Sequence, residues 1–162
     1  MNELAGIRVC MATSGHPPDD DRIFFKEART LAKAGADVVV LCARNQQIPA
    51  TTDGVRFVRY DGGGSLKARF CTVGRLEQAI AEQRCDVIHC HEPDGLVAAL
   101  RVKRRLGPKV IFDSHELWAG VAAVRFPRPL WPLAMAAYRH FERRWVAQCD
   151  AAIGASLAIT DY

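Results

Sequence analysis

Short apolar runs alternate with longer segments of helical spacing along most of the chain. Runs of strand length and high apolar content predict buried strands over 7–12, 37–42, 86–89, 109–112 and 150–154. Apolar residues that recur every three or four positions predict helices over 22–34, 66–84, 94–106 and 130–148. This alternation predicts an α/β fold, in which a doubly wound parallel sheet carries helices on both faces.

Three segments add detail to this pattern. Residues 55–60 alternate apolar with basic side chains, which predicts a strand exposed on one face. Residues 117–129 contain two prolines and are expected to be a loop or irregular. The apolar side of the helix over 130–148 predicts packing against the core, and contact of its Trp and Arg side chains with a membrane surface is the alternative.

The usual connectivity of such sheets predicts the strand order 3-2-1-4-5-6, which places the first and fourth strands side by side. Four of the five histidines then lie at or just past the end of an apolar run: His16, His89, His91 and His115. Open parallel sheets bind ligands at the carboxyl edge of their strands. The histidines therefore predict a functional site at this edge.

Composition narrows the class of protein. With 162 residues, 49% hydrophobic and 25% charged, the chain is long enough for one domain with its own core. The net charge of +4 is too mild to indicate nucleic-acid binding. No apolar stretch approaches the roughly 18 residues of a membrane span, and the N-terminus lacks a signal-peptide pattern. We therefore expect a cytoplasmic protein, and we expect its six cysteines, none in a Cys-x-x-Cys pair, to be reduced thiols.

The densest polar cluster is His89-Cys90-His91-Glu92-Pro93-Asp94-Gly95. His89 and His91 share one face if the strand continues, so a metal site completed by Glu92, Asp94 or His115 is one hypothesis. No ligand set of defined spacing completes it, and we expect no metal there. Instead we predict that His91 contacts a ligand while His89 packs within the sheet. Asp94 either contacts ligand or complements the dipole of the helix that follows.

The loop Ser14-Gly15-His16 lies where dinucleotide-binding folds carry Gly-x-Gly-x-x-Gly. A single glycine makes a nicotinamide or flavin cofactor unexpected, although the loop amides can still approach a phosphate. The acidic run 19–21 suits a helix start without a metal. Arg22 is poorly placed for the helix dipole, which indicates a specific role such as pairing with Asp19 or contacting an anion.

Adjacent residues in Asp113-Ser114-His115-Glu116 cannot converge as a catalytic triad, and we expect His115 and Glu116 to be polar contacts at the rim of the crevice. Ser156 is a suitable N-cap for a helix that would stop after less than two turns. We therefore expect the chain to be cut from a larger protein.

Three segments, taken in order, resemble glycosyltransferase family 4 proteins. The first runs His16-Pro17-Pro18-Asp19-Asp20-Asp21-Arg22-Ile23-Phe24, with Lys26-Glu27-Ala28, Leu31, Gly35 and the strand Val38-Val39-Val40 after it. The second comprises residues 86–95 and 109–116, and the third, residues 149–156, is similar to the family's Ala-Asp-x-x-Ile-x-x-Ser segment.

The resemblance implies a GT-B enzyme of two Rossmann-like domains. Residues 1–162 would form the N-terminal, acceptor-side domain, and the C-terminal domain, absent from this chain, would bind the nucleotide-sugar donor and supply an acidic motif. Transfer would occur in the cleft between them with retention of anomeric configuration, without a metal or any cofactor beyond the donor as co-substrate. His91 matches the histidine that reaches the transferred sugar, and the 14–16 loop matches the one that approaches the donor phosphates, although the family's paired glycines are missing.

The resemblance thus assigns His91 a catalytic role. Substrate contacts are expected from Ser14, Gly15, His16, Arg22, Glu92, Asp94, His115 and Glu116. A glycan, lipid or small-molecule acceptor is implied, in cell-surface polysaccharide or glycoconjugate synthesis at the inner face of the membrane, and the chain alone is expected to be inactive. Two alternatives stay open: a metal-dependent hydrolase using His89, His91 and His115, and a non-catalytic module that binds a nucleotide or a partner. A homodimer of the chain is also open.

Overall fold

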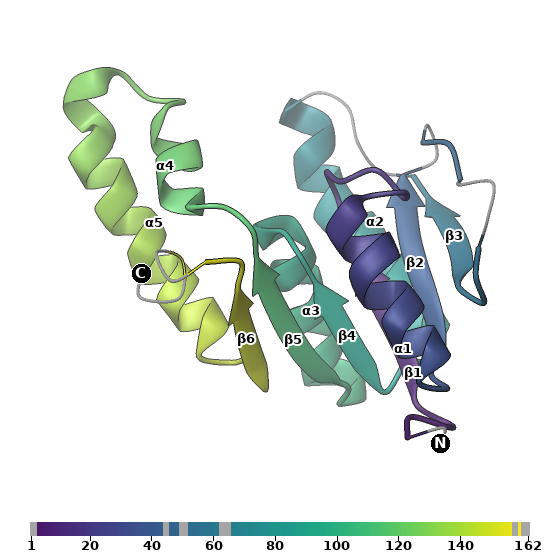
Figure 1. Cartoon of the computed structure of the whole chain (residues 1–162). Helices are drawn as coiled ribbons and strands as arrows, with labels where there is room; N and C mark the ends of the chain where they lie inside the picture. The colour runs from purple at the N-terminus through teal and green to yellow at the C-terminus, as the bar shows by residue number, and fades with distance from the viewer. Residues whose placement is uncertain (1–2, 44–45, 49–51, 62–65, 157–158, 160–162) are drawn as a thin grey trace.

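The computed structural model describes residues 3–43, 46–48, 52–61, 66–156 and 159, with side chains left undescribed over 66–71. One six-stranded parallel sheet forms the centre of the molecule, in the order β3-β2-β1-β4-β5-β6 (Figure 1). The predicted fold class and strand order are confirmed. The strands are β1 Arg8–Ala12, β2 Asp37–Ala43, β3 Arg56–Tyr60, β4 Val87–Cys90, β5 Lys109–Ser114 and β6 Ala151–Gly154.

Helices cover both faces of the sheet. A π-helix, η1 (Asp21–Ala28), continues into α1 (Arg29–Lys33) on one face, while α2 (Leu66–Gln83) and α3 (Pro93–Leu106) lie on the other (Figure 1). Alternate residues of β1 point to opposite sides, as a strand requires. Val9 and Met11 pack with η1, and Cys10 and Ala12 pack in the larger core beneath α2 and α3. The sheet therefore separates two apolar cores.

Local chemistry sets the helix ends. The Asp20 carboxylate accepts hydrogen bonds from the backbone N–H groups of Arg22 and Ile23 at 2.9 Å each, which caps η1 as the acidic run predicts. Pro93 opens α3, where its missing N–H costs nothing. Gly107 ends α3 with φ of 83°, a left-handed conformation that favours glycine.

In the C-terminal third, one sequence-based prediction was wrong and a second holds only in part. Residues 117–129 are not irregular throughout, because α4 (Trp118–Ala123) and a short 3-10 turn, η2 (Arg128–Leu130), form within them. The long helix, α5 (Trp131–Val146), is amphipathic but has no fully buried residue, so it does not pack deeply into the core. Only its end reaches the larger core, through the partly buried Trp145 and Val146.

Charge pairing adds to the backbone pairing that holds the edge strand β6 against β5. Asp150, just before β6, accepts hydrogen bonds from Lys103 Nζ at 2.6 Å, Lys109 Nζ at 2.8 Å and the Val110 backbone N–H at 2.8 Å. These bonds, with that of Lys103 the largest contribution, hold the pKa of Asp150 well below its usual range. One carboxylate thus joins α3, β5 and β6.

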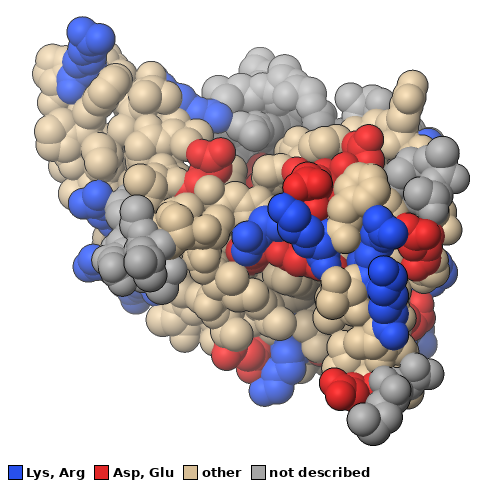
Figure 2. Space-filling model, in the orientation of Figure 1, with Lys and Arg blue, Asp and Glu red and all other residues tan. Residues whose placement is uncertain are grey.

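Basic and acidic side chains are interleaved over η1 and α1, so this face carries no uniform charge (Figure 2). Lys26 pairs with Asp21 at 2.9 Å, and Arg29 pairs with Asp53 at 2.7 Å. Free thiols are found at all the cysteines with described side chains, namely Cys10, Cys42, Cys85, Cys90 and Cys149, as expected; Cys71 lies outside that part of the chain. Among the described residues, no helix has the length and apolar character needed to cross a membrane.

Candidate active site

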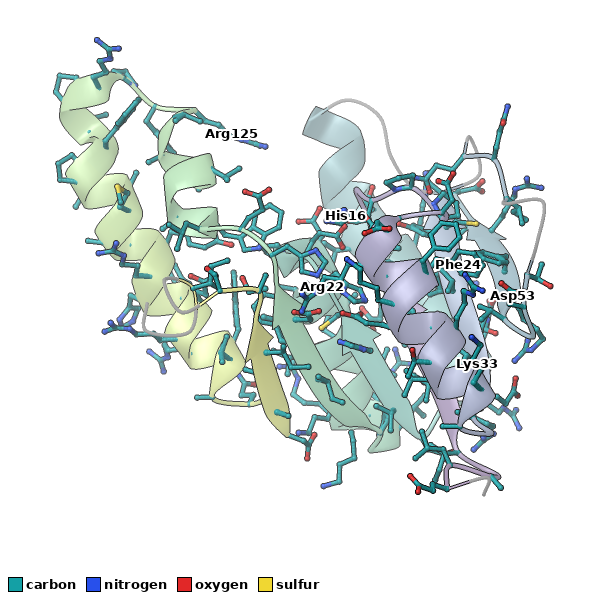
Figure 3. The ribbon with its side chains drawn as sticks, in the orientation of Figure 1. His16, Arg22, Phe24, Lys33, Asp53 and Arg125 are labelled. Atoms are coloured by element: carbon teal, nitrogen blue, oxygen red, sulfur yellow. The ribbon has the colours of Figure 1, made fainter. Side chains whose placement is uncertain are left out.

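A pocket of about 480 Å³ opens at the carboxyl edge of β1 and β4. One wall is the loop after β1 with the start of α3, and the other is α4 with part of α5. Arg125, just after α4, points across the opening toward the side where His16 lies (Figure 3). The pocket lining comprises Ser14, Gly15, His16, Glu92, Pro93, Asp94, Glu116, Trp118, Val121, Ala122, Arg125, Phe126 and Tyr138. The lining thus combines polar and charged groups on one side with apolar and aromatic groups on the other.

The buried Glu92 carboxylate organises the loop wall of this pocket. One oxygen accepts hydrogen bonds from Thr13 Oγ1 at 2.9 Å, the Gly15 N–H at 3.0 Å and the His16 N–H at 3.2 Å, and the other accepts from the Ser14 N–H at 3.0 Å. Successive amides aimed at one anion form a typical anion-binding arrangement. The backbone amides of residues 14–16 were expected to approach the donor phosphates. In the structure they instead donate to the Glu92 carboxylate of the chain itself.

A second polar group lies on the η1 side of the sheet, around Asp113. Arg22 donates from Nη2 to Asp113 Oδ1 at 2.8 Å and from Nε to Oδ2 at 2.9 Å, and Arg22 Nε lies 3.0 Å from Glu27 Oε1. Arg22 has a specific role, as its position suggested, but its partners are these two carboxylates and not Asp19, because the side chain turns inward. In Figure 3, Arg22 extends from η1 toward the middle of the sheet.

The π-helix makes the Arg22–Glu27 contact possible. Its hydrogen bonds join residues five apart, as from the Phe25 N–H to the Asp20 oxygen at 3.4 Å. Residues five positions apart therefore return to about the same side of η1. In an α-helix with 3.6 residues per turn, Arg22 and Glu27 would face different directions.

The four predicted histidines form a continuous column. Ring centroids are 5.1 Å apart between His16 and His115, 5.3 Å between His115 and His91, and 4.6 Å between His91 and His89. The exposed fraction of the side chain falls from 26% for His16 to 11% for His115 and 0% for His91, and it is 8% for His89 at the far end. The column thus runs from the pocket rim into the fold.

Burial determines the charge states around the column. It lowers the pKa of His89 to about 4, and, with the neighbouring His89 and His115, it lowers the pKa of His91 well below its usual range. Burial and the adjacent Asp113 raise the pKa of Glu27 to about 8. Burial also opposes ionisation of Asp113, but hydrogen bonds from His115 and Arg22 outweigh it and hold that pKa well below its usual range. At neutral pH the inner histidines are therefore neutral, and Asp113 is the ionised carboxylate.

The family model for Glycosyltransferase Family 4 matches residues 22–162, from η1 to the end of the chain. The chain belongs to this family. Among curated proteins, no close match was found. Membership in glycosyltransferase family 4 supports glycosyl transfer as the general function, with binding of a sugar donor and an acceptor.

In this family 4 chain, the structure brings six of the nine predicted site residues to the pocket: Ser14, Gly15, His16, Glu92, Asp94 and Glu116. His115 lies just behind it, against His16. Arg22 and His91 do not line the pocket, and His91 is fully buried rather than at the crevice. The catalytic assignment of His91 stays a prediction, and no exposed atom of its ring supports direct contact with a sugar in this domain.

Sequence reasoning missed several residues of both groups. Trp118, Arg125 and Phe126 line the pocket from a segment that was expected to be irregular. Glu27 joins the Asp113 group only because η1 is a π-helix, and a helical pattern of apolar residues carries no signal of that. The helix that carries Trp118 could have been predicted from the sequence, because an apolar stretch of helix-compatible spacing follows His115-Glu116.

Proposed function

We propose that this glycosyltransferase family 4 chain forms the acceptor side of a retaining glycosyltransferase. The enzyme would move a sugar from a nucleotide-sugar to a glycan, lipid or small-molecule acceptor in cell-surface polysaccharide or glycoconjugate synthesis, at the inner face of the membrane. The observation that carries the proposal is the pocket at the sheet's carboxyl edge within a chain that matches the family over 22–162.

The chemistry of the pocket suits a sugar-containing acceptor. Ligand sites usually combine apolar walls with a few placed polar groups. Here Trp118 and Phe126 offer apolar and aromatic surface, while Asp94 and Glu116 offer carboxylates that can accept hydrogen bonds from hydroxyl groups. Arg125 adds a cation that suits an acceptor phosphate or carboxylate.

In the proposed transfer, the acceptor oxygen bonds to the anomeric carbon as the bond from that carbon to the donor phosphate breaks. The phosphate leaves with the electron pair, and the acceptor hydroxyl proton passes to it. We assign direct sugar contact to His16 and His115, whose rings lie nearest the pocket. His91 supports His115 from behind, at a ring distance of 5.3 Å, as a positioning residue. The donor phosphates would be bound mainly by the second domain that the family implies, and the chain alone would not turn over.

Saturation-transfer NMR on the purified chain tests the acceptor site, using monosaccharides, oligosaccharides and UDP- and GDP-sugars as probes. We expect binding of at least one sugar class, weakened roughly fivefold by Glu116→Gln or Arg125→Ala, which is the loss of about one hydrogen bond. His140→Gln, on the exposed side of α5, is the matched control and should bind as the parent does. Failure of every sugar to bind, or binding that neither pocket variant changes, would contradict the site.

The same proposal includes contact of this chain with a membrane surface or with a second copy of itself. Several apolar side chains of the α4–α5 region are exposed, including Val124, Phe126, Leu133 and Phe141. Co-sedimentation with anionic vesicles and sedimentation equilibrium decide between the two contacts. If the chain stays monomeric and does not sediment with vesicles, both are excluded.

A further inference from the structure

Four side chains beneath Arg22 aim their donor atoms at one another. Glu27 comes from η1, His89 from β4, His91 from the residue after β4, and Asp113 from β5. One donor atom from each lies within 4.8 Å of the corresponding atom of all the others. His91 and Asp113 are fully buried, and the side chain of His89 is 8% exposed. We call these four residues the inner cluster.

Four polar atoms of the inner cluster have no hydrogen-bond partner within the described part of the chain. They are Glu27 Oε2, His89 Nε2 and both ring nitrogens of His91, and each is buried. Buried polar atoms in native proteins are nearly always satisfied. Three of these atoms, Glu27 Oε2, His89 Nε2 and His91 Nδ1, lie around a common point with Asp113 Oδ2, which indicates a ligand between them.

Between the two histidines and the two carboxylates, the distances suit an ion rather than direct contact. His91 Nδ1 lies 3.8 Å from Asp113 Oδ2 and 3.9 Å from Glu27 Oε2, and His89 Nε2 lies 4.0 Å and 3.9 Å from the same oxygens. These separations are too long for hydrogen bonds. Zinc bonds of about 2.0–2.2 Å place tetrahedral ligands about 3.4 Å apart, so these four distances would each shorten by roughly half an ångström around an ion.

We propose that Glu27, His89, His91 and Asp113 bind one divalent transition-metal ion of the zinc class. Imidazole and carboxylate ligands together suit such ions. The four protein ligands would fill a tetrahedral shell, as in structural zinc sites, so the ion would crosslink η1 to β4 and β5 rather than take part in transfer. This inference does not depend on the proposed function.

Outer contacts already orient the carboxylates. Arg22 holds Glu27 Oε1 at 3.0 Å and Asp113 Oδ1 at 2.8 Å, the oxygens that face away from the proposed ion. Asp113 Oδ2 also accepts from Arg22 Nε at 2.9 Å and lies 3.2 Å from His115 Nε2, so the ion would share this oxygen with two donors. Such outer partners typically fix metal ligands in position. The prediction that no metal binds considered Glu92, Asp94 and His115 as partners, whereas the fold supplies Glu27 and Asp113.

The test uses the purified chain, stripped with a chelator and then dialysed against zinc. We expect one zinc per chain by elemental analysis, a higher Tm with zinc than with chelator, and a Co²⁺ absorption spectrum typical of tetrahedral coordination. Glu27→Gln and His91→Gln should each lower zinc affinity by at least roughly 10–100-fold, the range known for loss of even an outer partner. The matched controls Glu116→Gln and His140→Gln should leave it unchanged.

Two results would overturn the proposal. One is a parent chain that binds no zinc after dialysis. The other is zinc that binds equally well to the parent, Glu27→Gln and His91→Gln, because such zinc would lie on thiols or exposed histidines instead. If His91→Gln does not fold, two measurements still test the proposal. They are the zinc affinity of Glu27→Gln, a substitution at a partly exposed side chain, and the Co²⁺ spectrum of the parent chain.

Discussion

A single side chain, Glu92, sets the shape of the loop that walls the candidate pocket. Four donors converge on its carboxylate, three of them backbone amides of residues 14–16. With Glu92 only 4% exposed, water cannot replace the carboxylate easily. The loop conformation therefore depends on one buried carboxylate. The position of Glu92 in the sequence, just after His91, does not reveal that its hydrogen-bond donors lie 76–79 residues earlier.

Replacing this anion should destabilise the loop. Glu92→Gln keeps the size of the side chain. It leaves only one acceptor oxygen, because an NH₂ group takes the place of the other oxygen and faces the backbone donors. We expect a loss of about 1–3 kcal/mol in the free energy of unfolding, the usual consequence of an unsatisfied buried group. Urea denaturation measures the loss, and hydrogen exchange should show faster exchange at the amides of residues 14–16. Glu116→Gln, an exposed carboxylate near the same pocket, should change neither. Equal stability of Glu92→Gln and the parent would show that the loop does not need the charge.

Regular elements were predictable where one sequence pattern dominates. The strands, α3 and the order of the sheet follow from apolar runs and from Pro93 and Gly107 as boundaries. The π-geometry of η1 was not predictable, because apolar spacing is similar for both helix types over two turns. Helix α4 was missed because nearby prolines favour a loop, yet both prolines fall after it, in and before η2.

At the edge of the sheet, Asp150 should make stability depend on pH. Its pKa is lowered in the fold, so the stabilisation is present above the unfolded value of about 3.9 and is lost as pH falls below it. Asp150→Asn should therefore have a lower Tm than the parent at pH 7, and the difference should shrink toward about pH 3. Thermal melts across this range measure it. Asp19→Asn, at an exposed carboxylate, serves as the control. A Tm difference that stays constant with pH would mean that the substitution acts through packing or hydrogen-bond geometry and not through the charge of Asp150.

At the scale of the whole molecule, the candidate site was predictable as a location but not as a set of contacts. Parallel strands bring the segments after β1, β4 and β5 to one edge, so His16, Glu92 and Glu116 had to lie near one another. Their burial could not be foreseen, because it depends on packing between η1, the sheet and α4. His91 is an example: its predicted position at the end of a strand was correct, whereas its predicted contact with a ligand requires an exposure that the side chain does not have.

The distribution of buried side chains predicts that the molecule does not open uniformly. Strands β1, β2 and β4 are buried over most of their length, whereas α5 has no fully buried residue and α4 has only Ala119 and Ala123. Segments with few buried apolar contacts open at lower free energy than the core. The region 118–146 should therefore unfold locally before the sheet does.

Native-state hydrogen exchange at increasing, sub-denaturing urea concentrations tests this order of opening. Amides of residues 118–146 should exchange with a lower opening free energy than amides of 8–12, 37–43 and 87–90, which should approach the global value. The pocket wall formed by α4 would then be mobile relative to the fixed loop wall, which suits a site that admits acceptors of different size. Equal protection of both regions would instead mean that α4 and α5 unfold together with the sheet as one cooperative unit.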